Sequence, residues 1–275
     1  PATEKSGGSV ANTVAVFAGL GGKAAYVGRV ADDQCGRVFQ HDMNSLGIDV
    51  RVPPAPAEKT TARCYILITP DGQRTMQTYL GACTELGLGD VNEETIGEPG
   101  IVLLEGYIFD LPEGPDVARL AIETVRRRGG KVALSLSDSL CVERHRTVFR
   151  ELVEEQIDLV FADEEEIYQL FATDSIEGVM SEASMLAGLF VVTRSEKGSV
   201  VINGDEFIEQ AAFPVDKVVD TTGAGDTYTA AFLAALVKGE PLERCARIAS
   251  WCGARVIQQV GARYQGDILE GYPES

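Results

Sequence analysis

The stretch from Val218 to Leu236, V-V-D-T-T-G-A-G-D-T-Y-T-A-A-F-L-A-A-L, constrains the fold of this 275-residue chain more than any other. A β-branched pair leads into a Thr-Thr-Gly-Ala-Gly turn, and Asp226 then opens a run of small and apolar residues that stops at Gly239 and Pro241. Glycine and proline in these positions usually end a helix. The pattern therefore predicts the end of a strand, a tight loop and a buried helix.

The predicted loop has the composition of an anion site. Gly223, Ala224 and Gly225 carry almost no side chain, so their backbone N–H groups, at the positive end of a helix, can face an anion. Asp226 follows in the first turn, where the helix dipole favours a carboxylate. A base beside a bound phosphate indicates phosphoryl transfer to a hydroxyl. The alternative is a plain loop whose aspartate caps a core helix.

The string D-T-T-G-A-G-D followed by a small-residue helix resembles the C-terminal signature of the ribokinase-like, or PfkB, family of carbohydrate and nucleoside kinases. The resemblance implies an α/β fold in three layers, with a central, mostly parallel sheet flanked by helices and a small β-sheet lid. It implies ATP and Mg²⁺ as cofactors. It also implies that Asp226 is the catalytic base and that Gly223, Ala224 and Gly225 hold the γ-phosphate.

A second glycine-rich stretch, S-G-G-S-V-A-N-T, precedes a predicted small-residue helix near the start of the chain. Gly7 and Gly8 leave the backbone accessible to a ligand, and the Asn12 amide can both donate to and accept from hydroxyl groups. A plain glycine-rich helix start is the alternative. The N-terminal signature of the PfkB family is similar, and this resemblance implies that Gly7, Gly8 and Asn12 contact the substrate.

Residues 193–198, T-R-S-E-K-G, follow a predicted strand and resemble the T-x-G-x-x-G nucleotide loop of the family, with Ser195 in place of the middle glycine. A simple turn between strands is the alternative. The resemblance implies that Thr193, Ser195, Gly198 and Thr222 bind the nucleotide, together with the loop before Asp226.

The run Asp163-Glu164-Glu165-Glu166 begins the helix after another predicted strand, where four acids suit the helix dipole. An acidic helix cap explains the run without any metal. The family carries N-x-x-E in this place, and its glutamate holds Mg²⁺ mainly through water. The resemblance thus assigns Mg²⁺ to Glu166 and to Asp163, which replaces the usual asparagine. It also implies that Asp220 helps to hold a monovalent cation such as K⁺.

Hydrophobic patterning predicts strands that alternate with helices over most of the chain, which indicates a parallel sheet covered on both faces. A strand is predicted from Ala24 to Val30, and Asp33 is predicted to cap the helix after it. Near the C-terminus, a helix is predicted from Leu242 to Val260, with residues 252–257 bordering the adenine by resemblance. The other predicted strands cover residues 101–104, 131–137, 157–162, 189–194, 199–202 and 206–208. No G-x-x-x-x-G-K-[ST] or well-placed G-x-G-x-x-G occurs, which argues against P-loop and dinucleotide sites.

Residues 48–82 interrupt this alternation. Two strand-like runs, A-R-C-Y-I-L-I-T and Q-R-T-M-Q-T-Y, flank the turn signal Pro70-Asp71-Gly72. We expect these residues to form a lid, with residues 1–47 and 83–275 forming the main nucleotide-binding and catalytic domain. The resemblance implies that the lid closes over the acceptor site and pairs two subunits into a homodimer. It also places the first lid strand before Pro1.

The formal net charge of −18 opposes binding to nucleic acid or to an anionic membrane. No apolar run approaches the roughly 18 residues of a membrane span. The six cysteines form no C-x-x-C pair, and the two histidines show no metal-ligand spacing. These features favour a soluble protein of a reducing cytoplasm without structural zinc, whose partner is a small-molecule sugar or nucleoside.

Three stretches, P-A-T-E-K-S-G-G-S-V-A-N-T, Arg74-Thr75-Met76 and L-S-L-S-D, resemble the adenosine-kinase-type branch of the family. They favour adenosine or another ribose-like 5′-hydroxyl as the acceptor. A free-sugar kinase, such as a fructokinase or ribokinase, is the alternative. A catalytically silent nucleotide or sugar sensor is a third hypothesis, because Asp163 and Ser195 depart from the family pattern.

Overall fold

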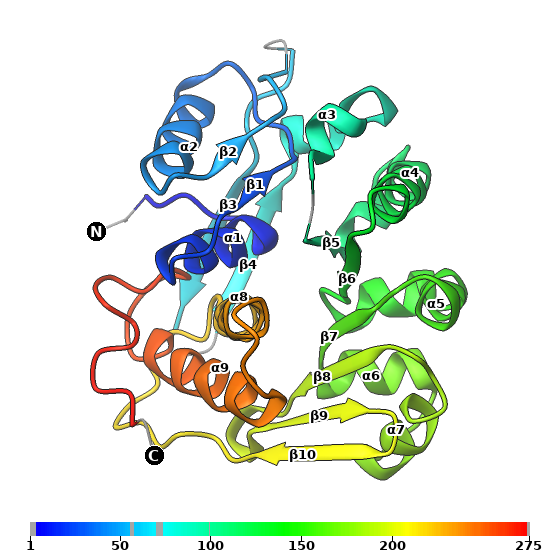
Figure 1. Ribbon diagram of the computed structural model, residues 1–275. Coiled ribbons are helices and arrows are strands. Elements are labelled where there is room, and N and C mark those ends of the chain that lie inside the picture. Colours follow the sequence, from blue (N-terminus) through cyan, green and yellow to red (C-terminus); the bar gives the residue numbers. More distant parts are fainter. Residues whose placement is uncertain (1–3, 56–57, 70–73, 99, 274–275) are drawn as a thin grey trace.

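The computed structural model describes residues 4–55, 58–69, 74–98 and 100–273 (Figure 1). Its central sheet has the strand order β10-β9-β8-β7-β6-β5. The four strands β5 to β8 are parallel, and β9 and β10 continue the sheet as an antiparallel hairpin. The strands are β5 (Ile101–Glu105), β6 (Lys131–Ser135), β7 (Leu159–Asp163), β8 (Leu189–Thr193), β9 (Ser199–Asn203) and β10 (Glu206–Gln210). The predicted α/β sheet is therefore confirmed.

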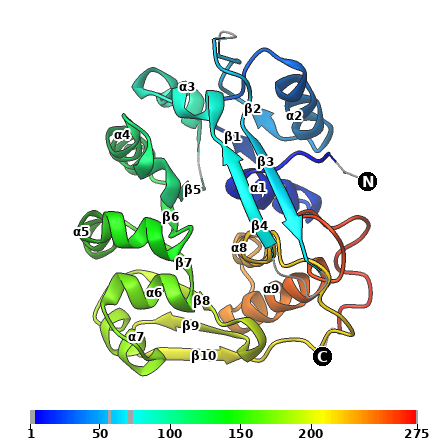
Figure 2. The ribbon, with the colours of Figure 1, turned by 180° about the vertical axis from the view of Figure 1, so that it is seen from behind.

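Helices cover both faces of this sheet (Figures 1 and 2). Alternate residues of one strand enter different cores, since successive side chains point to opposite faces. In β7, Val160 and Ala162 pack on one side, and Leu159 and Phe161 pack on the other. The helices of the first side are α4 (Gly114–Arg127), α5 (Ser139–Glu155), α6 (Glu164–Phe171) and α7 (Ile176–Ala183). Those of the second side are α8 (Ala224–Leu236) and α9 (Leu242–Val256).

Helix α8 lies in the middle of the molecule, between α9 and α1 (Ser9–Gly19) (Figure 1). Every residue from Thr227 to Ala235 is buried, which explains why the sequence there is almost wholly small or apolar. Phe232 meets Phe161 of the sheet edge-on, with 5.7 Å between ring centroids. The predicted buried helix is confirmed, and its N-terminus is fixed between the sheet and α1.

The segment before the predicted loop differs from expectation. Val218 to Asp220 forms no strand, because the backbone N–H groups of Val219 and Asp220 both donate to the carbonyl of Ile257 instead of to a neighbouring strand. The helix predicted to reach Val260 ends at Val256, and turns follow it.

The strand predicted from Ala24 to Val30 is also shorter than expected. Only β1 (Ala25–Tyr26) pairs, in parallel with β2 (Asp49–Val50), in a separate two-stranded sheet. Arg29 leaves the strand path to bind the carboxylate of Asp90, with Nε at 3.0 Å. Helix α2 (Gln34–Ser45) begins as predicted, since Oδ1 of Asp33 accepts from the N–H of Gly36 at 2.8 Å.

Residues 48–82 contain the antiparallel pair β3 (Arg63–Ile68) and β4 (Arg74–Tyr79) (Figure 2). The predicted turn Pro70-Asp71-Gly72 lies outside the described residues, as do Pro1 and Pro56. Short helical segments follow the pair: η1 (Gly81–Glu85), η2 (Leu88–Asp90), α3 (Glu93–Ile96), η3 (Gly106–Asp110) and η4 (Ser195–Lys197). None of the helices that the structure describes is long and apolar enough to cross a membrane.

Candidate active site

Asp226 lies in the first turn of α8, immediately after the predicted anion loop. Gly223 precedes the helix in the left-handed region, with φ +76°, and a Cβ there would lie 2.6 Å from the carbonyl oxygen of Ala262. A side chain at this position would therefore be strained and would also clash. A Cβ at Gly225 would meet nothing within 4 Å. The first turn of α8 is therefore open on the side where a Gly225 side chain would project.

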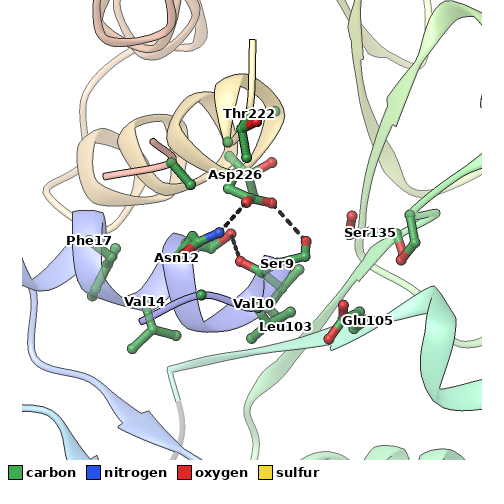
Figure 3. Close-up of a pocket in the computed structure, with 18 of the residues that line it drawn as sticks. Ser9, Val10, Asn12, Val14, Phe17, Leu103, Glu105, Ser135, Thr222 and Asp226 are labelled. Atoms are coloured by element: carbon green, nitrogen blue, oxygen red, sulfur yellow. Dashed lines mark hydrogen bonds between the residues drawn. The ribbon is translucent and has the colours of Figure 1, made fainter. Parts of the chain in front are cut away.

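Two residues of α1 bind the Asp226 carboxylate (Figure 3). The Ser9 hydroxyl donates to Oδ1 at 2.7 Å, and the Asn12 amide nitrogen donates to Oδ2 at 2.9 Å. Ser9 and Asn12 are three positions apart, so they share one face of the helix. Asn12 is only 5% exposed. The structure thus brings together the two glycine-rich stretches near opposite ends of the chain.

Gly7 and Gly8 lie beside this contact, at the start of α1. Gly8 is the N-cap and has φ +104°, a conformation that favours glycine. Both glycines line the same large pocket as Asn12 and Asp226. The structure therefore places all three predicted substrate residues at one site.

Glu105 and Ser135 face Asp226 and Ser9 across the pocket (Figure 3). They end the adjacent parallel strands β5 and β6. Burial, with the nearby charge of Asp226 as the second cause, raises the pKa of Glu105 to about 7. Glu105 belongs to no motif and was not predicted from the sequence. An acidic residue at the carboxyl end of a buried parallel strand was the available signal, because ligands bind at this edge of α/β sheets.

The predicted nucleotide loop lines the same pocket, through Thr193, Ser195 and Gly198. Ser195 adopts a left-handed conformation, with φ +50°. The family motif has glycine at this position, and the left-handed backbone conformation of Ser195 is one that glycine adopts readily. A Cβ at Gly198, whose φ is +93°, would lie 2.0 Å from the carbonyl oxygen of Gln210. Glycine is therefore required at 198 for close packing of two backbone segments.

Asp163 and Glu166 form a reciprocal cap at the start of α6. The N–H of Glu166 donates to Asp163 at 2.8 Å, and the N–H of Asp163 donates to Glu166 at 2.9 Å. Burial raises the pKa of both carboxyls, and the mutual repulsion of the pair contributes for Glu166, whose pKa rises to about 8. Both residues line the pocket. A buried Glu166 carboxyl beside the more exposed Asp163, whose charge disfavours that of Glu166, suits a hard cation such as Mg²⁺.

Asp220 is buried and binds the loop that precedes α8. Its Oδ1 accepts from the backbone N–H and the hydroxyl of Thr222, at 2.9 and 2.6 Å. Its Oδ2 accepts from the N–H of Gly261 at 2.8 Å. In the structure Asp220 ties the anion loop to the turn after α9. The monovalent-cation role expected for this residue remains a prediction.

One further cluster lies on α5 and the segment before α4. Cys141, His145 and Asp110 each offer a ligand atom, all within 4.8 Å of one another, a grouping that the sequence spacing did not suggest. Arg144 binds both oxygens of Asp110, at 3.0 and 2.6 Å, and so neutralises the carboxylate. The cluster is an ion-pair network in this structure.

Comparison with known proteins agrees with this arrangement. The sequence profile of the pfkB family of carbohydrate kinases matches residues 2–268. The chain belongs to the PfkB family. It is therefore an ATP-dependent sugar or nucleoside kinase, a phosphotransferase with an alcohol acceptor.

Individual PfkB relatives align over most of the chain. Ribokinase of Arabidopsis thaliana is 29% identical over 270 residues, which cover 94% of this chain and 68% of that protein. Fructokinase-1 of Oryza sativa subsp. japonica is 30% identical over 273 residues, which cover 93% and 83%. The structure of adenosine kinase from Sinorhizobium meliloti is 41% identical, with a TM-score of 0.94, and the match covers 98% of this chain and 83% of that one.

Proposed function

We propose that this PfkB kinase phosphorylates a nucleoside, with the 5′-hydroxyl of adenosine or a similar ribose-containing acceptor as its substrate, and that Asp226 is the base. One observation supports the assignment of Asp226 more than any other. Its carboxylate lies in the first turn of α8, accepts hydrogen bonds from Ser9 and Asn12, and lines the pocket that the glycine-rich loops also line. A base, an anion site and donors for hydroxyl groups thus surround one space.

The proposed reaction begins with an acceptor hydroxyl directed at Asp226. Its proton passes to the carboxylate as the acceptor oxygen forms a bond to the γ-phosphorus of ATP. The bond between that phosphorus and the bridging oxygen breaks, and its electron pair leaves with ADP. The N–H groups of Gly223, Ala224 and Gly225, at the positive end of α8, stabilise the negative charge on the transferred phosphoryl oxygens.

Asp163 and Glu166 would hold Mg²⁺ near the nucleotide, and the ion would neutralise phosphate charge there. The repulsion within this pair supports the assignment, since a cation removes it. Glu164 is not equivalent to them, because Arg194 and Lys197 already bind its carboxylate at 3.0 Å. Thr193, Ser195, Gly198 and Thr222 line the proposed ATP site, and K⁺ near Asp220 belongs to the same proposal.

The acceptor would lie between α1 and the ends of β5 and β6. Gly7 and Gly8 give it access to the backbone, and the Asn12 amide has a second N–H besides the one bound to Asp226. Glu105 faces the same space and, with a pKa of about 7, can donate to an acceptor oxygen when protonated and accept from a hydroxyl when ionised.

A nucleoside is preferred to a free sugar because this chain is 41% identical to an adenosine kinase, against 29% and 30% for the ribokinase and fructokinase above. A probable sugar kinase of Rhizobium etli, at 40% identity, keeps the free sugar in contention. A kinase for free ribose or fructose is the second candidate. Substrate pockets vary within one fold, so only an assay can separate the two candidates.

Residues 48–82 would form the lid, with residues 1–47 and 83–275 as the main domain. Strands β3 and β4 expose Tyr65, Leu67 and Met76 by 66, 69 and 51%. A two-stranded pair with large exposed apolar side chains is rarely stable without a partner. We therefore propose that these strands close over the acceptor and pair with a second subunit.

The test is ADP release from Mg-ATP with a panel of adenosine, inosine, ribose and fructose. Turnover on adenosine that is lost in Asp226→Asn would support the proposal, whereas turnover on a free sugar alone would favour the second candidate. ATP binding without turnover on any member of the panel would instead favour a nucleotide sensor.

A further inference from the structure

Arg263 follows α9 and contacts Asn12 from the side opposite Asp226. Its Nε donates to Oδ1 of Asn12 at 3.1 Å, while Nδ2 of Asn12 donates to Asp226 at 2.9 Å. The amide of Asn12 therefore stands between a cation and a carboxylate, with one end bound to each. The three residues come from separate elements: Asn12 from α1, Asp226 from α8, and Arg263 from the segment after α9.

The partial burial of Arg263 is costly and is not balanced by an ion pair. Among the described residues, no carboxylate lies within salt-bridge distance of its guanidinium, and its Nη2 is buried without a hydrogen-bond partner. Burial is also the main cause that lowers the pKa of this arginine. The charges of Asp42 and Asp226 oppose this shift, but neither carboxylate forms an ion pair with Arg263 among the described residues. Partial withdrawal of a cation from water without a close ion pair is costly. The side-chain hydrogen bond that the structure describes for this guanidinium goes to Asn12.

The charge on either side decides which way the Asn12 amide points. In the observed orientation, the oxygen faces the guanidinium and the nitrogen faces the carboxylate. The reversed orientation would place N–H groups against the N–H groups of Arg263 and an oxygen against Asp226. Both contacts would then be repulsive, so Arg263 and Asp226 together favour the orientation in which Asn12 donates to the base, and Arg263 adds to the preference that the carboxylate sets.

The backbone around Arg263 is itself fixed. Its carbonyl accepts from the Gln259 side chain at 2.9 Å, and the N–H of Gly261 donates to the buried Asp220 at 2.8 Å. A residue that orients another group must be held in place by its own surroundings. The loop after α9 meets that condition.

We infer that Arg263 is a positioning residue of the kinase site: it holds the Asn12 amide in the orientation that fixes the Asp226 carboxylate for proton transfer. The inference rests on the proposed role of Asp226 as base. It assigns no direct contact with the substrate to Arg263, which acts through Asn12. A small misplacement of a reacting group can reduce a rate by about 100-fold.

The first test is a double-mutant cycle for ADP release, with Arg263→Met, Asn12→Ala and the double variant. We expect Arg263→Met to lower kcat by about 10- to 100-fold while the KM for ATP changes less than about threefold. In the Asn12→Ala background, Arg263→Met should lower kcat no further. Arg263→Lys, which keeps a charged donor, should retain more activity than Arg263→Met. Equal losses in both backgrounds, or an unchanged kcat in Arg263→Met, would overturn the inference.

The second test does not depend on turnover. The side-chain amide signals of Asn12 are assigned by NMR from their loss in Asn12→Ala, and their exchange with water is compared in wild type and Arg263→Met. Faster exchange in Arg263→Met is expected, and equal exchange would contradict the positioning role. Arg247→Met is the matched control, because Arg247 is a partly buried arginine that donates to Pro273 and lies outside the pocket. It should leave both readouts unchanged.

The two tests also separate this inference from the proposed function. A wild-type protein that turns over no acceptor would contradict the proposed function, and the NMR comparison would still decide whether Arg263 fixes Asn12. Turnover by the wild type without coupling between Arg263 and Asn12 would contradict the inference alone. Melting curves and ATP titration of each variant identify any variant that fails to fold.

Discussion

The Asn12 amide and the Asp226 carboxylate are 214 positions apart in the chain, yet they form a hydrogen bond of 2.9 Å. Because α1 also packs on α8, the same interface that buries these helices builds the polar centre of the pocket (Figure 3). Packing and chemistry therefore depend on one helix pair. A change that loosens α1 should reduce activity before it unfolds the sheet.

Asp226→Asn should reduce turnover by at least about 100-fold, because an amide cannot take the proton of the acceptor hydroxyl. ADP release at saturating ATP and acceptor measures the effect. The folded state should persist, since the amide can still bind Ser9 and Asn12 and only the favourable charge at the helix start is lost. Asp116→Asn, which removes an exposed acid from the first turn of α4, is the control. Near-normal turnover in Asp226→Asn would exclude the residue as the base.

Much of the fold could be predicted because its signals are local. Strands β5 to β8 are short apolar runs between amphipathic helices, and Asn203-Gly204 marks the β9–β10 hairpin. The two-residue length of β1 could not be predicted, because local residue preference shows neither that residues 27–30 leave the sheet nor that Arg29 pairs with Asp90, 61 positions away. Local residue preference therefore predicts the strands of the central sheet but not the short strand β1.

The candidate site was predicted only where residues form a motif. Gly223, Asp226, Gly8 and Asn12 belong to such stretches, and the structure brings them together. Ser9 lies within the glycine-rich stretch but was not predicted as a site residue, and Glu105 and Arg263 have no motif around them, so the roles of all three emerge only from contacts across the fold. A hydrogen bond such as that between Arg263 and Asn12, 251 positions apart, leaves no trace in local sequence.

Glu105 should make stability depend on pH. Its pKa rises from the ordinary glutamate value of 4.5 to about 7 in the folded protein, so the folded state binds the proton more tightly than the unfolded state. Its contribution to the free energy of unfolding is therefore fully present below about pH 4.5 and is lost as the pH rises through about 7. Urea unfolding of wild type and Glu105→Gln at a series of pH values measures this contribution.

The Gln variant serves as the reference because its amide resembles the protonated acid and cannot ionise. As the pH rises from about 5 to about 8, the unfolding free energy of the wild type should fall relative to that of Glu105→Gln. A difference that stays constant over this range would show that the Glu105 pKa is not raised. The acceptor KM, measured over the same range, should change with pH in the wild type and not in Glu105→Gln.

The two glycines of the anion loop should respond differently to alanine. Gly223→Ala should destabilise the protein by at least about 1 kcal/mol, because φ is +76° and a Cβ would clash with Ala262. Gly225→Ala should leave stability unchanged or raise it by up to about 1 kcal/mol, since residue 225 is helical and open. Its methyl group would instead obstruct the phosphate. Calorimetric titration with ATP, beside thermal unfolding, would reveal weakened binding in a fully stable Gly225→Ala protein, and undiminished binding would argue against an anion site there.

Leu67→Lys should weaken self-association through β3 and β4. The Leu67 side chain is 69% exposed, and a charge at this position would have to lose its water in an apolar interface. Sedimentation velocity over a range of protein concentrations measures the change. Met185→Lys is the matched control, since Met185 is 72% exposed but lies after α7, far from these strands in the chain. Equal behaviour of the two variants would place any dimer interface elsewhere.

Ser195→Gly should raise stability by up to about 1 kcal/mol and leave ATP affinity unchanged. Ser195 already holds φ +50°, where a side chain costs about 1–2 kcal/mol, and the greater freedom of glycine in the unfolded chain offsets part of the gain. Ala172→Gly, at φ +52° after α6, should give a similar gain away from the pocket. Thermal unfolding and ATP titration of both variants provide the comparison. A tenfold or larger change in ATP affinity confined to Ser195→Gly would show that this serine reshapes the nucleotide loop, and that its departure from the family pattern alters binding as the sensor hypothesis requires.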